Sequence, residues 1–292
     1  MADRRRQGDP AHAEQSTAVV LDRPVSTGGD AQSGVSRPMS PFRNILKLIT
    51  GDFAAKALYF VAFVYLAKTL GVAGYGVLEF AVAIRAYLLL LADGGLELWA
   101  VREVAKGRDI RRLVARVVPL RAALAVAAYA AVNTVLGILP DNPNLRKVLP
   151  VLALTVFLQA FNLKWVSLGT GKMYHVAAGL VVGQAVFSAL VFLFVRGSEH
   201  LVLVGLIWLG SELVMVLYFG GLFANTYGAI PPRLEIRGSI RTLRTSLVLG
   251  LSLGLGQVNY GVGSVLLGVL KGPGVVGWYG AAYKPEIGRA HV

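Results

Sequence analysis

The chain has 292 residues, of which 55% are hydrophobic, with a mean hydropathy of +0.61, 34 glycines and no cysteine. A water-soluble domain of this size rarely reaches that apolar content, so the composition indicates a multi-spanning membrane protein. The formal net charge of +13 does not indicate nucleic-acid binding, because Lys and Arg lie between long apolar runs and not along one face. The lack of cysteine excludes disulfides and thiolate chemistry.

The first 42 residues are rich in Arg, Gly, Pro, Ser, Asp and Gln, and they contain no apolar core of the kind that a secretory signal needs. We expect residues 1–42 to form a disordered, basic cytoplasmic tail. Its triplet Arg4, Arg5 and Arg6 either helps to orient the first helix or contacts a lipid surface.

Continuously apolar segments follow this tail, and each is long enough to cross a hydrocarbon core, which takes roughly 20 helical residues. The sequence therefore predicts an all-α polytopic membrane bundle. We place a six-helix bundle at residues 43–226, with helices at 45–69, 77–98, 116–139, 147–168, 174–195 and 201–224. A seventh helix is expected at 246–270 and an eighth from Val275.

The basic residues are distributed asymmetrically between the connecting segments. With the N-terminus inside, only four lie in outer segments, namely Arg146, Lys147, Arg196 and Lys271, whereas the tail and inner loops hold sixteen. This predicts a multi-pass inner (plasma) membrane protein with a cytoplasmic N-terminus. Residues 227–245 form either an amphipathic cytoplasmic linker or an ordinary basic loop.

A glycine-rich stretch occurs twice. Residues 71–76 join the first two predicted helices, and a similar stretch at 274–280 joins the seventh and eighth, 203 residues later. This spacing indicates two related six-helix halves, with a substrate path between them, so residues 246–285 would begin the second bundle. The final residues 286–292 match the translation of a common sequencing adapter, so we expect this tail to be non-native and the natural protein to continue beyond Pro285.

Several motifs resemble a known family. They are Ala67-Lys68-Thr69-Leu70-Gly71 with Gly74-Tyr75-Gly76, Asp93-Gly94-Gly95-Leu96 leading into Val101-Arg102-Glu103-Val104-Ala105, and Gly277-Trp278-Tyr279-Gly280. Over residues 44–285 the chain is similar to the Wzx-like polysaccharide flippases of the multidrug/oligosaccharidyl-lipid/polysaccharide exporter superfamily. Gly263 stands where we would expect an acidic residue before Leu266-Leu267-Gly268.

The resemblance implies a transporter and no covalent chemistry. It would move an undecaprenyl-diphosphate-linked glycan from the cytoplasmic to the outer leaflet by alternating access, without a cofactor. Its partners would be this glycan, membrane lipids and glycan polymerase machinery. One alternative is a multidrug or small-solute antiporter of the same superfamily, and another is a membrane glycan polymerase or ligase, although every outer loop is short for such an enzyme.

Ionisable residues inside the apolar helices are the candidate site. A charge at bilayer depth is costly, so these side chains should face protein or a watery cavity. Lys56, Arg85 and Glu212 lie too deep to reach the membrane surface, and Asp52 precedes Lys56 by one helical turn. Either the four residues form internal ion pairs, or Lys56 and Arg85 form a cationic cavity that attracts the diphosphate of a lipid carrier. A net-cationic interior would favour an anionic substrate over cationic drugs.

Two further acids lie near the inner end of the second predicted helix. Asp93 and Glu97, beside Gly94-Gly95, form either a coupling or gating site or a helix cap with a solvated face. We expect Arg121 and Lys164 to anchor at the headgroups. Side-chain amides at five positions would bind sugar hydroxyls or neighbouring helices: Gln159, Asn162, Gln184, Gln257 and Asn259. The four scattered histidines give no metal or catalytic spacing.

Overall fold

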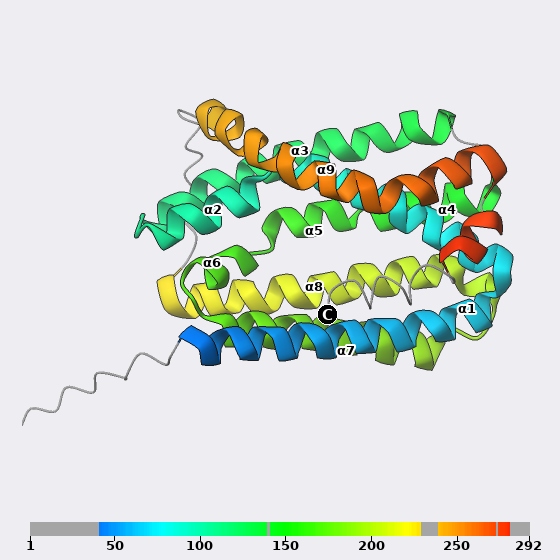
Figure 1. Ribbon diagram of the computed structural model, residues 1–292, viewed down its shortest axis with the longest axis horizontal. Coiled ribbons are helices and arrows are strands. Elements are labelled where there is room, and N and C mark those ends of the chain that lie inside the picture. Colours follow the sequence, from blue (N-terminus) through cyan, green and yellow to red (C-terminus); the bar gives the residue numbers. More distant parts are fainter. Residues whose placement is uncertain (1–40, 139–140, 229–238, 273, 281–292) are drawn as a thin grey trace, which may run out of the picture. The chain divides into compact units, whose positions relative to one another are not determined.

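The computed structural model describes residues 41–138, 141–228, 239–272 and 274–280, and within them the chain forms helices and no strand. Figure 1 shows these helices as α1 (Pro41–Asp93), α2 (Leu96–Ala105), α3 (Ile110–Ile138), α4 (Pro143–Ala153), α5 (Thr155–Phe161), α6 (Lys164–Gly169), α7 (Met173–Phe194), the short 3₁₀ helix η1 (Ser198–His200), α8 (Leu201–Tyr227) and α9 (Ser239–Lys271). Residues 274–280 are also helical. The all-α fold predicted from the sequence is confirmed.

Helix α1 is a hairpin of two arms. Its one non-helical residue is Gly71, with φ 67° and ψ 174°, and Figure 1 shows the chain reversing between the blue first arm and the cyan second arm. A positive φ is the conformation that glycine adopts without a Cβ penalty. We expected residues 71–76 to connect the two helices, but a single glycine makes the turn and helix resumes at Val72.

The fourth predicted helix, expected as one span at 147–168, is broken into α4, α5 and α6. Pro150 lies inside α4 and has no N–H to donate to the preceding turn. At Asn162 the backbone is extended, with ψ 112°, and its side-chain oxygen accepts a 3.0 Å hydrogen bond from the N–H of Lys164. Such a local bond replaces a helical one, so the apolar run alone did not reveal the break.

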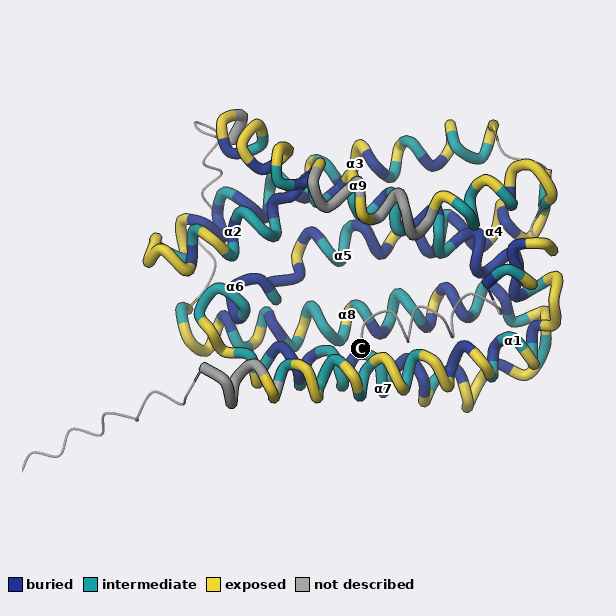
Figure 2. Tube along the Cα trace, viewed as in Figure 1, coloured by how far each residue is buried: buried dark blue, intermediate teal, exposed yellow. Residues whose placement is uncertain are grey.

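The helices have the length and surface of membrane-crossing segments. Within the described residues, five helices are long and apolar enough to cross a bilayer, and the first covers 46 residues, Leu48–Asp93, which includes the turn at Gly71. Large apolar side chains are exposed along them, for example Phe53 and Leu217. Exposed positions recur along the first arm of α1 in Figure 2. A water-soluble protein rarely exposes so much apolar surface, whereas lipid covers it without cost.

The core is built from contacts between helices that are distant in sequence. The first arm of α1 packs on α7, which packs on α8, and α9 packs on both α1 and α2. One large core cluster contains the aromatic group Tyr59, Phe63, Phe187 and Trp208, with ring centroids 4.2–6.3 Å apart. A second core cluster surrounds the fully buried Trp165. Hence α6, although only six residues long, is fixed by burial.

The two glycine-rich copies touch each other. A Cβ built on Gly277 would lie 2.7 Å from the carbonyl oxygen of Val72 and 3.2 Å from the Cα of Gly76. Real Cβ atoms almost never approach backbone so closely, so the contact depends on glycine at this position. The repeat found in the sequence therefore corresponds to two segments that lie side by side in space.

A second glycine contact lies where α1 ends. Gly94 and Gly95 both have positive φ, 52° and 77°, and they separate α1 from α2. A Cβ on Gly250 of α9 would lie 2.8 Å from the carbonyl carbon of Gly94. The backbones of α9 and of the bend between α1 and α2 are therefore closely packed at Gly250.

Several predicted segments lie outside the described residues. They are 1–40 of the predicted tail, 229–238 of the predicted linker, and 281–292, which includes the suspected adapter tail. The last part of the predicted linker, from Ser239, is helical and continues directly into α9.

Candidate functional site

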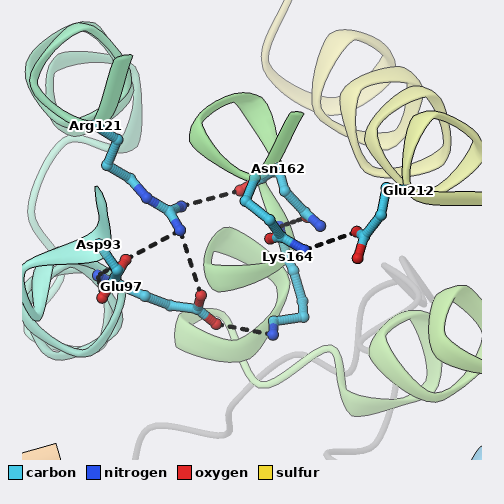
Figure 3. A network of polar contacts seen from close by, with 7 residues as sticks. Asp93, Glu97, Arg121, Asn162, Lys164 and Glu212 are labelled. Carbon is cyan, nitrogen blue, oxygen red and sulfur yellow. Dashed lines mark hydrogen bonds and ion pairs between the residues drawn. The ribbon is translucent and has the colours of Figure 1, made fainter. Parts of the chain in front are cut away.

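Two polar clusters lie inside the helical bundle. We call the first the Arg121 cluster; it consists of Asp93, Glu97, Arg121, Asn162 and Lys164 (Figure 3). We call the second the Arg85 cluster; it consists of Arg85, Thr155, Gln159, Trp208 and Glu212. Every ionisable member of both clusters is paired.

In the Arg121 cluster, a buried guanidinium joins two carboxylates. Arg121 is only 3% exposed, and its Nη2 lies 3.0 Å from Asp93 Oδ1 and 3.6 Å from Glu97 Oε2. Lys164 Nζ approaches the other oxygen of Glu97 at 3.0 Å. We expected Arg121 and Lys164 to reach the headgroups; instead Arg121 is buried and both residues are paired within the bundle. A buried cation is tolerated only with such partners.

Both helix breaks supply members of the Arg121 cluster. Asp93 precedes the Gly94-Gly95 bend and accepts hydrogen bonds from the N–H of Glu97, at 3.2 and 3.4 Å, so it caps the start of α2. Arg121 Nη1 donates to the carbonyl of Asn162 at 3.4 Å. This carbonyl lies at the break between α5 and α6, where it has lost a helical partner. The cluster therefore satisfies two interrupted helices as well as pairing charges.

In the Arg85 cluster, Glu212 is held from two sides. Its Oε1 accepts from Arg85 Nη2 at 2.9 Å, and its Oε2 accepts from Gln159 Nε2 at 2.7 Å. Arg85 also donates to the hydroxyl of Thr155 at 2.6 Å and stacks on Trp208, 4.8 Å from the ring centroid. Arg85 and Glu212 side chains are 8% and 12% exposed. These contacts fix Arg85 in one position.

Lys56 is in a different environment. Its Nζ lies 2.8 Å from Asp52 Oδ2, one helical turn away, as the sequence predicted, but the side chains are 64% and 45% exposed. Because the turn of α1 is one residue, Lys56 and Arg85 both lie about 20 Å from Gly71 along their arms, at 1.5 Å per residue. An exposed ion pair at that depth must face a polar space and not hydrocarbon.

Lys56 borders an open space between α1, α7 and α8. It is a cavity of about 210 Å³ lined by Ala55, Lys56, Tyr59, Leu180, Gly183, Gln184, Phe187, Trp208, Ser211, Glu212 and Met215. Lys56 and Glu212 thus share one cavity, and Arg85 lies behind Glu212. Asp93 and Glu97 belong to the Arg121 cluster and do not line it.

Both cations of the candidate site have acidic partners. The sequence left two readings open, internal ion pairs or a net-cationic cavity at Lys56 and Arg85, and in the structure each has its own carboxylate, Asp52 and Glu212. Net charge therefore does not distinguish an anionic from a cationic substrate. Sequence reasoning also missed Thr155 and Trp208, since one hydroxyl and one indole in an apolar run carry no special signal. No group of His, Asp and Glu in the described residues has the arrangement of a metal site.

Comparison with known proteins identifies the family. No curated protein and no solved structure matches the chain. The family model described as polysaccharide biosynthesis protein matches residues 42–286, which is most of the chain and includes both polar clusters and the cavity. The chain therefore belongs to the polysaccharide biosynthesis protein family, the family of the Wzx-like flippases.

Proposed function

We propose that this protein moves a lipid-linked oligosaccharide from the cytoplasmic to the outer leaflet of the inner membrane by alternating access. Its family supports a membrane transporter of polysaccharide precursors in general. The proposed direction is the one that the family resemblance implies, and the basic inner segments favour a cytoplasmic N-terminus. The carrier would be undecaprenyl diphosphate, and glycan polymerase machinery would receive the product.

The observation that carries this proposal is the cavity between α1, α7 and α8, which has Lys56 and Glu212 in its lining. The ion pair of Lys56 and Asp52 is exposed, and exposed pairs of this spacing contribute only about 0.3–0.5 kcal/mol. Lys56 can therefore exchange its partner for the phosphate of a substrate at little cost. Arg85, which is held by three residues, cannot do so without breaking a buried pair.

We accordingly assign the phosphate contact to Lys56, and to Arg85 the role of positioning Glu212. Asp52 would hold Lys56 in place when no substrate is bound. Asp93 and Glu97 remain candidates for coupling or gating, because they lie at the Gly94-Gly95 bend that α9 contacts. No covalent step is needed for such a cycle.

A complementation assay tests the role of Lys56. The complete gene would be expressed in a strain that lacks its own flippase, and surface glycan would be measured. We expect Lys56→Ala to reduce export roughly tenfold or more, since a charge-assisted contact contributes about 1.5–3 kcal/mol. Lys56→Arg should restore part of the activity. Lys68→Ala is the matched control, because Lys68 is exposed on the same arm but does not line the cavity.

Normal export by Lys56→Ala would remove the role of Lys56, and failure of the unaltered gene to restore surface glycan would remove the flippase proposal. The antiporter alternative predicts a different outcome. The unaltered gene would then protect cells against cationic drugs and would not restore surface glycan. Because Lys56 and Arg85 are each paired with a carboxylate, this experiment decides between the two substrates where net charge cannot.

A further inference from the structure

The cavity between α1, α7 and α8 contains a hydrogen-bond donor with no acceptor. The side-chain nitrogen of Gln184 is buried and has no partner within the described residues, and Gln184 lines this cavity. An unsatisfied buried amide costs about 1–3 kcal/mol, so native structures leave few of them. An acceptor from a ligand, or from water that a ligand displaces, would satisfy a donor in this position.

The same cavity also offers acceptors. Each oxygen of Glu212 accepts one protein hydrogen bond, from Arg85 or from Gln159, and each carboxylate oxygen has a second lone pair. The hydroxyl of Ser211 donates to the carbonyl of Trp208 at 2.8 Å, which leaves its own oxygen able to accept. A ligand group here would therefore need to donate as well as accept.

Although the net charge of the cavity is balanced, the local carboxylate of Glu212 disfavours an anion beside it. Glu212 is balanced by Arg85, and Lys56 is balanced by Asp52. A diphosphate has acceptors only, and the carboxylate of Glu212 would repel it. A neutral hydroxyl group, by contrast, can donate to Glu212 and accept from Gln184 at the same time.

The size of the cavity and its aromatic side chains further restrict the class of ligand that fits. A volume of about 210 Å³ is below the roughly 300–1,000 Å³ of sites for drug-sized ligands, so it suits a single ring. Tyr59, Phe187 and Trp208 form one wall, and Trp208 packs 5.3 Å from Phe187. Aromatic side chains offer a flat apolar surface beside their polar edge, which complements a ring that carries C–H groups on its faces and hydroxyls at its rim.

We propose that this cavity is a subsite for one neutral sugar ring, with Gln184 and Glu212 as its hydrogen-bonding residues. This deepens the proposed function and rests on it: the ring would be the sugar nearest the lipid carrier. Lys56, whose exposed ammonium lies at the wall of the same cavity, would then contact the phosphate attached to that sugar.

Sugar binding can be measured directly on the full chain in lipid nanodiscs by saturation-transfer NMR. The probes are methyl glycosides of neutral hexoses and of N-acetylhexosamines, with inorganic pyrophosphate for comparison. We expect saturable binding of at least one glycoside, with at least tenfold weaker affinity in Gln184→Leu. Asn133→Leu is the matched control: it makes the same kind of change at an exposed amide on α3, and it should bind like the unaltered protein.

Thermal unfolding of the same variants separates binding from folding. Gln184→Leu removes a buried donor that has no protein partner, so its melting temperature should equal or exceed that of the unaltered protein. A residue with a merely structural role would instead lower stability when removed.

The proposal is overturned if no glycoside in the panel binds, if Gln184→Leu binds within twofold of the unaltered protein, or if pyrophosphate binds and depends on Gln184. Those results leave the flippase proposal intact as long as the complete gene exports glycan. Conversely, Gln184-dependent sugar binding without export would overturn the flippase and retain the subsite.

Discussion

Replacing Arg121 by glutamine should destabilise the protein strongly. Arg121 is 3% exposed and pairs with Asp93 at 3.0 Å and Glu97 at 3.6 Å. Removing one partner from a buried ion pair costs about 3–5 kcal/mol, because the other charge stays buried without its counterpart. Glu97 keeps Lys164 as a partner at 3.0 Å, so most of the loss should come from Asp93.

A double-mutant cycle tests that attribution. Asp93→Asn alone should also destabilise the protein, since it leaves Arg121 with one ion-pair partner fewer and weakens the cap of α2. In the double variant the two losses should not add, and a coupling free energy of about 1–3 kcal/mol is expected for groups in direct contact. Arg112→Gln is the control: this arginine, also on α3, lies 3.3 Å from Asp109 but is 83% exposed, so it should cost about 1 kcal/mol or less.

The assay is reversible unfolding of the purified protein in lipid bicelles, with the free energy of unfolding measured for each variant under the same lipid composition. Equal losses in Arg121→Gln and Arg112→Gln would refute the argument from burial. If the losses in free energy of unfolding at Arg121 and Asp93 simply added in the double variant, the direct pairing of these two residues would be refuted.

Two glycine contacts give further predictions, each with a control that lacks the contact. Gly95→Ala should lower the free energy of unfolding by about 1–3 kcal/mol more than Gly107→Ala does. Both glycines have φ near +77°, but only a Cβ at position 95 would meet the backbone of Gly250. Equal losses in the two variants would show that backbone strain alone matters. Gly277→Ala should lower the melting temperature while Gly274→Ala, with open space around it, should not; a harmless Gly277→Ala would mean that the two glycine-rich copies do not need to touch.

The sequence predicted those features that depend on apolar run length and on charge spacing. It located the α1 hairpin, the all-α membrane fold and the pair of Asp52 and Lys56, and it singled out Arg85 and Glu212, which the structure pairs with each other. All of these follow from periodicity or from the cost of a charge in hydrocarbon.

What the sequence did not reveal depends on contacts between distant helices. We expected Arg121 to reach the headgroups, because its distance from the helix end permits it. Only the packing of α1 and α2 against α3 shows that Arg121 pairs instead with Asp93 and Glu97 inside the bundle. The break at Asn162 was hidden for a related reason: the segment is apolar on both sides, and the interruption is stabilised by Arg121 from another helix.

The pairing of Arg85 with Glu212 also bears on how the protein is made. The two residues are 127 positions apart in the chain. At a synthesis rate of about 5–20 residues per second, roughly 6–25 s pass between the addition of Arg85 and that of Glu212. During that time the guanidinium has no carboxylate from α8, and releasing its helix alone into lipid would carry the cost of an unpaired charge. We therefore expect the second arm of α1 to remain with the insertion machinery, or with other nascent helices, until α8 emerges.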